Sequence, residues 1–303
     1  MTQKPQKKAG GTRWGFRIIT SISLIVGIAA FLAFSGLKGG VALIAVLCAL
    51  TARDFIRITA PNTSLLMFGL LLSVCGALPP ILHFALEWSA LEPDPLLPWI
   101  DGILVFFLLS QVLTLTRKGK IPSFIKRPEF AVWGITLPFC SVILQLDMLL
   151  AQGFPQGTVL RWCVIVIGVA KIMDMGALLV GSQIGRHKLA PSISPGKTIE
   201  GAIGGVVIAS IAALAFFTFW DYPERALGTH SPIIWTIKVI VSGACIALMA
   251  MVGDLFESSV KRSCSAKDSG GILPGIGGIY DLTDSLVAAC PTGYLLIKYF
   301  ILG

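Results

Sequence analysis

The sequence predicts an all-α, polytopic integral membrane protein built as a helical bundle, and three observations carry that prediction. The chain has 303 residues, of which 55% are hydrophobic and only 13% are charged, and its mean hydropathy is +0.83. Soluble domains carry about 25% charged residues. Apolar stretches of about 20 residues, the length of a helix that crosses a bilayer, recur along the chain. Nothing alternates with period two as a membrane barrel strand would, so we expect the spans to be helices.

The apolar segments predict about nine transmembrane helices. They fall at residues 16–35, 39–56, 64–84, 98–115, 129–151, 158–182, 199–220, 232–257 and 279–302. We divide the chain into a basic cytoplasmic tail (1–15), N-terminal transmembrane helices (16–156) and a C-terminal catalytic transmembrane region with cytoplasmic motif loops (157–303). The first span follows a basic stretch, as in a signal peptide. No convincing cleavage site follows it, so we expect an uncleaved span.

Lysine and arginine residues predict the orientation. With the N-terminus in the cytoplasm, most of the 24 basic residues fall in cytoplasmic loops, whereas the opposite loops are acidic. These basic loops account for the formal net charge of +8, which favours contact with anionic lipid headgroups. We therefore expect no nucleic acid as a partner. The seven cysteines form no C-x-x-C pair, which argues against a disulfide framework and a zinc site. We expect a multi-pass protein of the cell inner (plasma) membrane with its active site facing the cytoplasm.

The stretch from Met251 to Ser285 concentrates the charged residues. It holds five of the sixteen acidic residues, three basic residues and six glycines between two apolar segments. The charged residues are Asp254, Glu257, Lys261, Arg262, Lys267, Asp268, Asp281 and Asp284. Ionisable groups beside lipid are costly, so such a stretch indicates a functional site.

The spacing of these residues predicts two polar helix faces. On a helix, Asp254, Ser258 and Lys261 share one face, and Asp281 and Asp284 share another. Two such faces joined by a glycine-rich loop could meet across a polar cavity. Mg²⁺ takes oxygen ligands and favours one or two carboxylates together with substrate phosphates, where it neutralises the charge of an in-line displacement. An ion-paired plug between helices is the structural alternative, but so many carboxylates would repel one another without a cation.

A second polar segment runs from Asp174 to Gly205. Asp174 lies inside an apolar helix and needs a partner there. The loop after it combines cations with hydroxyl groups, which suits phosphate oxygens. We expect its Ser-Pro-Gly-Lys-Thr run to open a helix with N–H groups that face an anion. The segment is not a P-loop, because no glycine stands at the first glycine position of that pattern. His187 is more typical of a solvated loop residue than of a base. Glu200 could simply complement a helix dipole.

Three motifs in the C-terminal half have fixed spacings. Ser258–Pro274 reads S-x-V-K-R-x-x-x-x-K-D-x-G-x-x-L-P and continues as G-G-I-x-D-x-T-D at Gly277–Asp284. Upstream lie G-D-L-F-E-S at Gly253–Ser258 and H-K-L-A-P-x-x-S-P-x-K-T-x-E-G at His187–Gly201. Together they resemble the signature of phosphatidate cytidylyltransferases, also called CDP-diacylglycerol synthases. The resemblance covers about residues 170–290, and the N-terminal half agrees only in hydropathy and topology.

The resemblance implies transfer of a cytidylyl group from CTP to phosphatidic acid, which gives CDP-diacylglycerol and pyrophosphate for phospholipid synthesis. It implies Mg²⁺, a second cation such as K⁺, contact with the lipid bilayer, and a homodimer. The catalytic residues that it implies are Asp254, Asp281, Asp284, Asp268, Lys267 and Glu200, with Asp254, Asp281 and Asp284 as metal ligands. The substrate-phosphate-binding residues that it implies are Ser194, Lys197, Thr198, Ser258, Lys261, Arg262, Gly277 and Gly278.

Two positions depart from the family pattern. Ile276 stands where the family usually has histidine, and Leu282 stands where it has arginine. Neither side chain can hold a phosphate, but the surrounding acids, lysines and glycines are intact, so we expect activity to survive. The alternatives are a related membrane nucleotidyl- or phosphotransferase for another lipid phosphate or a polyprenol, a membrane transporter, and an inactive paralogue. The polar residues cluster in one half of the chain, which argues against a transporter made of two related halves.

Overall fold

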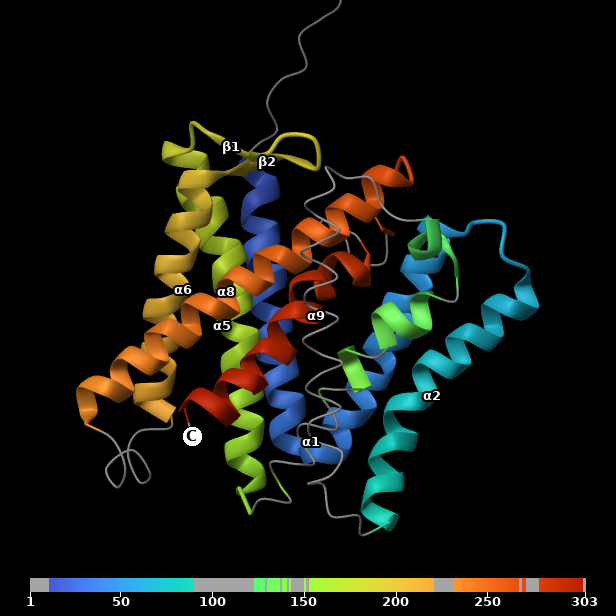
Figure 1. Ribbon diagram of the computed structural model, residues 1–303, viewed down its shortest axis with the longest axis horizontal. Coiled ribbons are helices and arrows are strands. Elements are labelled where there is room, and N and C mark those ends of the chain that lie inside the picture. Colours follow the sequence, from blue (N-terminus) through green and yellow to red (C-terminus); the bar gives the residue numbers. More distant parts are fainter. Residues whose placement is uncertain are drawn as a thin grey trace, which may run out of the picture.

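The computed structural model is mostly helical, which confirms the predicted helical class (Figure 1). It describes residues 11–89, 123–128, 130–136, 138–140, 142, 150, 153–220, 231–266, 269–270 and 278–301. The predicted span 98–115 and about half of the span 129–151 lie outside the described residues. The total of about nine spans, the domain division and the orientation therefore stay predictions.

Two long helices form the N-terminal part of the described chain. Helix α1 (Gly11–Thr59) covers two predicted spans and is interrupted at Gly36, whose φ of 61° is readily adopted by glycine. Helix α2 (Leu65–Ser89) follows after a short turn. The 3-10 turn η1 (Ser123–Lys126) and the π-helical turn η2 (Ala131–Thr136) lie further along the chain, and η2 packs against both long helices.

Four further helices form the C-terminal part. They are α5 (Gln156–Ile184), α6 (Ile199–Trp220), α8 (Pro232–Ser263) and α9 (Ile279–Leu296), and α9 continues into the π-helical turn η3 (Ile297–Ile301). Helix α5 packs along α6, and α8 packs against both α6 and α9. Figure 1 shows α8, in orange, running obliquely across the bundle with α9, in red, beside it.

Four helices of the described chain are long and apolar enough to cross a membrane. Their spans are Leu65–Phe84, Gln156–Ile184, Ile199–Trp220 and Pro232–Ser263. Large apolar side chains are exposed on several of them, including Leu65, Ile211 and Phe219. Exposed apolar faces of this kind are expected where a helix meets lipid, so the chain is an integral membrane protein.

A short β-hairpin joins α5 to α6, and the sequence analysis had predicted no strand. Strand β1 (Lys188–Ala190) pairs antiparallel with β2 (Ser194–Thr198). The expectation that the Ser-Pro-Gly-Lys-Thr run opens a helix is wrong, because this run is strand β2 and α6 begins at Ile199. A residue before proline favours extended backbone, so Pro195 keeps Ser194 in strand geometry.

Two apolar cores hold the helices together. The first lies among α5, α6, α8 and α9 and includes the buried Trp162 and Phe217. The second lies among α1, α2, the two short turns and parts of α8 and α9. There the rings of Phe55 and Tyr280 meet edge to face with their centroids 5.8 Å apart. Helix α9 contributes to both cores and therefore links the two parts of the protein.

Candidate active site

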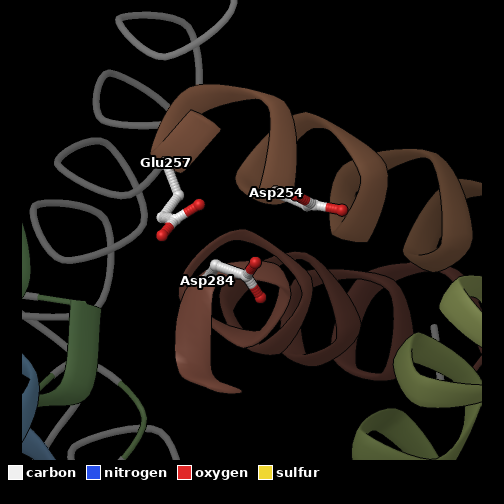
Figure 2. Close-up of side chains that lie close together, drawn as sticks. All are labelled: Asp254, Glu257 and Asp284. Carbon is white, nitrogen blue, oxygen red and sulfur yellow. The ribbon is translucent and has the colours of Figure 1, made fainter. Parts of the chain in front are cut away.

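Three acidic side chains from α8 and α9 lie close together (Figure 2). Asp254 and Glu257 come from α8 and Asp284 comes from α9, and one carboxylate oxygen of each lies within 4.8 Å of the others. Glu257 is 1% exposed and Asp284 is 8% exposed. Like charges repel strongly at this distance away from water. The cluster therefore calls for positive charge.

A glycine lets the two helices approach closely at this point. Gly253 precedes Asp254 on α8, and a methyl group on it would overlap the backbone carbonyl oxygen of Asp284. Any larger residue would push α8 away from α9. The close approach at Gly253 is what places the carboxylates of the two helices within reach of a common ligand.

Two lysines supply part of the positive charge. Lys197 of strand β2 lies 2.6 Å from an oxygen of Asp254. Lys261 of α8 lies 2.8 Å from Glu257 and 2.7 Å from Asp281. Both lysines were predicted to bind substrate phosphates, and both contact carboxylates of the site in this structure. Their role toward phosphate stays a prediction.

A third lysine reaches the site from α5. Lys171 donates hydrogen bonds to the carbonyl oxygen of Leu282 at 2.8 Å and to the hydroxyl of Ser285 at 2.7 Å, and it lies 3.6 Å from Asp174. The lysines also contact Asp174 and Asp281, so the site contains five carboxylates and three ammonium groups. The formal charge of these eight groups is −2. One divalent cation would balance that charge.

The donor set also fits a hard cation. Carboxylate oxygens are the ligands that Mg²⁺ prefers, and it is commonly held by one or two carboxylates together with substrate phosphates. Asp254, Glu257 and Asp284 are the residues of the described chain that could hold such an ion. The family resemblance implies no role for Glu257, and the structure places it in the cluster.

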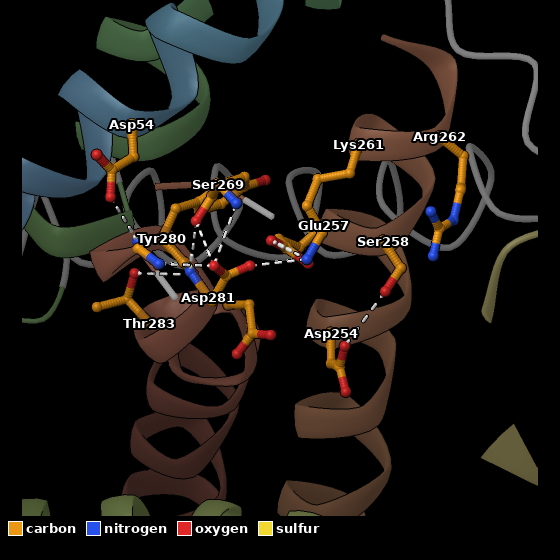
Figure 3. Close-up of polar contacts among 12 residues, drawn as sticks. Asp54, Asp254, Glu257, Ser258, Lys261, Arg262, Ser269, Tyr280, Asp281 and Thr283 are labelled. Atoms are coloured by element: carbon orange, nitrogen blue, oxygen red, sulfur yellow. Dashed lines mark hydrogen bonds and ion pairs between the residues drawn. The ribbon is translucent and has the colours of Figure 1, made fainter. Parts of the chain in front are cut away.

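Asp281, the other predicted metal ligand, fastens the start of α9 (Figure 3). Its Oδ2 accepts hydrogen bonds from the Gly278 N–H at 2.7 Å and from the Ser269 hydroxyl at 2.6 Å. Its Oδ1 accepts one from Lys261 at 2.7 Å. Ligation by Asp281 stays a prediction, and it would require the carboxylate to exchange some of these partners.

A residue from the N-terminal part caps α9. Gly278 precedes the helix and has no side chain with which to accept the first N–H groups. Asp54 of α1 does so instead, because its Oδ2 accepts from Ile279 N at 2.7 Å and from Tyr280 N at 3.5 Å. Asp54 is 1% exposed, and a methyl group on Gly278 would lie 2.6 Å from that oxygen. Gly278 and Asp54 therefore form one cap.

Two predicted site residues shape the hairpin. Glu200, in the first turn of α6, accepts hydrogen bonds from the N–H groups of Arg186 at 3.0 Å and His187 at 3.2 Å, and it lies 2.5 Å from His187 Nδ1. Thr198 accepts a hydrogen bond from Gly201 N at 3.1 Å, as a helix cap does. Their contribution to substrate binding stays a prediction.

The remaining predicted residues lie at the edge of the site or outside the described chain. Ser258 Oγ lies 3.5 Å from Asp254 Oδ1, and Ser194 begins β2. Arg262 donates its Nε–H to Ile193 O at 3.2 Å, and its other N–H groups have no protein partner among the described residues. Lys267, Asp268, Ile276 and Gly277 lie outside the described residues.

Sequence reasoning missed the contributions of Lys171 and Asp54. A signal for Lys171 existed, because it lies three residues before Asp174 in an apolar helix and an acid in a span needs a partner. Asp54 is likewise an acid inside an apolar segment. No local pattern indicated that it would cap a helix 225 residues further along the chain.

The fold and the site define an integral membrane protein with a cluster of three carboxylates between two helices that could hold a metal ion. The model of the cytidylyltransferase family matches residues 15–300. The chain therefore belongs to the cytidylyltransferase family, which confirms the resemblance seen in the sequence.

Three relatives show how far the similarity extends. The phosphatidate cytidylyltransferase of Bacillus subtilis (strain 168) is 40% identical over 127 residues, 42% of this chain and 44% of that protein. The phosphatidate cytidylyltransferase of Staphylococcus aureus (strain COL) is 40% identical over 126 residues, 42% of this chain and 45% of that protein. The uncharacterized protein YnbB of Escherichia coli (strain K12) is 32% identical over 167 residues, 55% of this chain and 52% of that protein. The chain spans about half the length of the relatives that it matches.

Proposed function

We propose that the protein transfers a cytidylyl group from CTP to phosphatidic acid, giving CDP-diacylglycerol and pyrophosphate. The observation that carries this proposal is the cluster of Asp254, Glu257 and Asp284 within a chain of the cytidylyltransferase family. Two relatives named phosphatidate cytidylyltransferase support phosphatidic acid as the acceptor. A related lipid phosphate or a polyprenol is the alternative acceptor.

In this reaction an anionic oxygen of the lipid phosphate attacks the α-phosphorus of CTP. A new phosphorus–oxygen bond forms as the bond to the bridging oxygen breaks, and pyrophosphate leaves with that electron pair. The attacking oxygen is already anionic at neutral pH, so no strong general base is required. Mg²⁺ held by Asp254, Glu257 and Asp284 would neutralise the charge of the triphosphate.

The side chains around the cluster would bind and orient the phosphates. Arg262 presents N–H groups beside the hairpin, and a guanidinium group suits phosphate oxygens. Lys197 and Lys261 lie within reach of the carboxylates that would share the cation. On the basis of the family motif, the proposed site also includes Ser194, Thr198, Glu200, Ser258, Lys267, Asp268, Gly277, Gly278 and Asp281.

The distribution of basic residues supports a site that faces the cytoplasm, where CTP is available. A multi-pass position in the inner (plasma) membrane would give the same site access to its lipid acceptor. A second cation such as K⁺ and a homodimer are further proposals that rest on the family resemblance.

Turnover in detergent micelles tests this function. Purified protein is mixed with Mg²⁺, labelled CTP and phosphatidic acid, and CDP-lipid is followed by chromatography. Parallel reactions replace CTP by dCTP or ATP and phosphatidic acid by a polyprenol or its phosphate. Asp284→Asn protein that is expressed and purified in the same way controls for contaminating host enzymes.

We expect CDP-diacylglycerol from the wild type and almost none from the variant. Product with a polyprenol acceptor alone would replace the proposed lipid substrate. No product with any donor and acceptor would contradict the enzyme function and favour an inactive paralogue or a transporter.

A further inference from the structure

Lys171 lies near the middle of α5, a helix long and apolar enough to cross the membrane. A lysine in such a helix usually extends its ammonium group toward the membrane surface. Lys171 instead reaches α9, where it bonds the carbonyl oxygen of Leu282 and the hydroxyl of Ser285. Its side chain is only 16% exposed. A charge placed there at such cost indicates a function.

The ammonium group of Lys171 is part of the electrostatic environment of the carboxylate cluster. Ser285 directly follows Asp284, and the Ser285 N–H donates to the Asp284 carboxylate. The ammonium group of Lys171 lies 2.7 Å from the Ser285 hydroxyl and 3.6 Å from the carboxylate of Asp174. Lys171 therefore contacts both the residue that follows Asp284 and a further carboxylate, so its removal would make the surroundings of the cluster more negative.

The charge balance of the site makes this lysine consequential. The five carboxylates and three lysines of the site have a formal charge of −2, and without Lys171 the charge would be −3. A more negative site attracts a divalent cation more strongly and repels an anionic substrate more strongly. These two effects have opposite signs, which distinguishes them from the effect of simply loosening a helix contact.

We propose that Lys171 sets the charge of the carboxylate cluster: it weakens the binding of a divalent cation there and favours the binding of the anionic nucleotide. This inference rests on the proposed function, because it assumes that a cation and a triphosphate meet at this cluster. Lys171 acts through its neighbours and is a positioning residue rather than a catalytic one.

Binding of Mn²⁺ to the purified full-length protein tests the proposal without relying on turnover. Electron paramagnetic resonance of free Mn²⁺ gives the dissociation constant for wild type, Lys171→Met and Lys171→Arg. Lys238→Met is the matched control, because Lys238 belongs to another membrane-spanning helix and lies 5.8 Å from the centroid of the Phe300 ring. The KM for CTP is measured for the same four proteins.

We expect Lys171→Met to bind Mn²⁺ at least fivefold more tightly than the wild type while its KM for CTP rises at least threefold. Lys171→Arg keeps the charge and should stay within about twofold of the wild type for Mn²⁺, as should Lys238→Met. Unchanged or weaker Mn²⁺ binding in Lys171→Met would overturn the proposal and leave Lys171 as a structural contact. A wild type that binds no Mn²⁺ would overturn the proposed metal site itself, and this inference with it.

Discussion

The two parts of the protein use buried charge differently. Around α8 and α9 of the C-terminal part, carboxylates and lysines gather at one point, and their formal charges do not cancel. In the core between α1 and α2, the buried carboxylate of Asp54 accepts hydrogen bonds from backbone N–H groups at the start of α9. The first arrangement has the donor set of a cation site, and the second holds the start of a helix. The N-terminal part thus supports the helix on which two of the site acids lie.

The comparison is tested most strongly by removing a charge from the cluster. Asp254→Asn should lower turnover by three decades or more, about 4 kcal/mol of activation free energy, because the cluster loses the negative charge of one of its three carboxylates. Initial rates with CTP and phosphatidic acid measure this. Asp221→Asn, a change of the same kind at an acid that follows α6 in the sequence, should leave the rate unchanged. Equal rates for Asp254→Asn and wild type would remove this residue from the site.

A smaller effect is expected from separating the two helices without changing charge. In Gly253→Ala the new methyl group would collide with the Asp284 carbonyl oxygen, so α8 and α9 must move apart. Overpacking of this kind costs about 1–3 kcal/mol of stability. We expect a lower midpoint of thermal unfolding in detergent and a tenfold or greater loss of turnover.

Gly69→Ala is the control for that change, because a methyl group on Gly69 would meet no atom within 4 Å. It should match the wild type in both measurements. If Gly253→Ala also matched the wild type, the close approach of α8 and α9 would not be what positions the carboxylates.

The supporting role of the N-terminal part predicts a graded response at Asp54. Asp54→Ala leaves the N–H groups of Ile279 and Tyr280 without their acceptor, at a cost of about 1–3 kcal/mol. Asp54→Asn keeps an acceptor oxygen and should be milder, since asparagine caps helices about as well as aspartate. We expect the midpoint of thermal unfolding to fall in the order wild type, Asp54→Asn, Asp54→Ala. An Asn variant as damaged as the Ala variant would mean that the charge of Asp54, and not the cap, is required.

The smallest effect is expected at the hairpin. Glu200→Gln keeps an oxygen acceptor for the N–H groups of Arg186 and His187 but loses the negative charge beside the His187 ring. We expect the KM for CTP to rise about twofold to threefold with little change in kcat, since less than about 1 kcal/mol is involved. A large fall in kcat would place Glu200 in the reaction instead of in the hairpin.

The sequence alone predicted the helical class, the five segments that became α2, α5, α6, α8 and α9, and the family. Apolar length and fixed motif spacing carry that information. It also predicted Asp254 and Asp284 as neighbours, because helical spacing places each on a polar face. The sequence did not predict the hairpin, because a five-residue strand directly before a helix is too short to show a clear periodicity. The cap by Asp54 and the reach of Lys171 depend on which helices pack together, and one chain's periodicity does not show that.

The most direct test of the central claim is the Mg²⁺ dependence of cytidylyl transfer in wild type and in Asp284→Asn. With CTP and phosphatidic acid at saturating concentrations, Mg²⁺ is titrated from a chelated start into the millimolar range. The account predicts no turnover without the cation, saturable activation of the wild type, and a loss of about three decades in the variant at every concentration. Turnover of the wild type that does not depend on Mg²⁺, or an Asp284→Asn variant with the same activation curve, would contradict a cation-binding cluster of Asp254, Glu257 and Asp284.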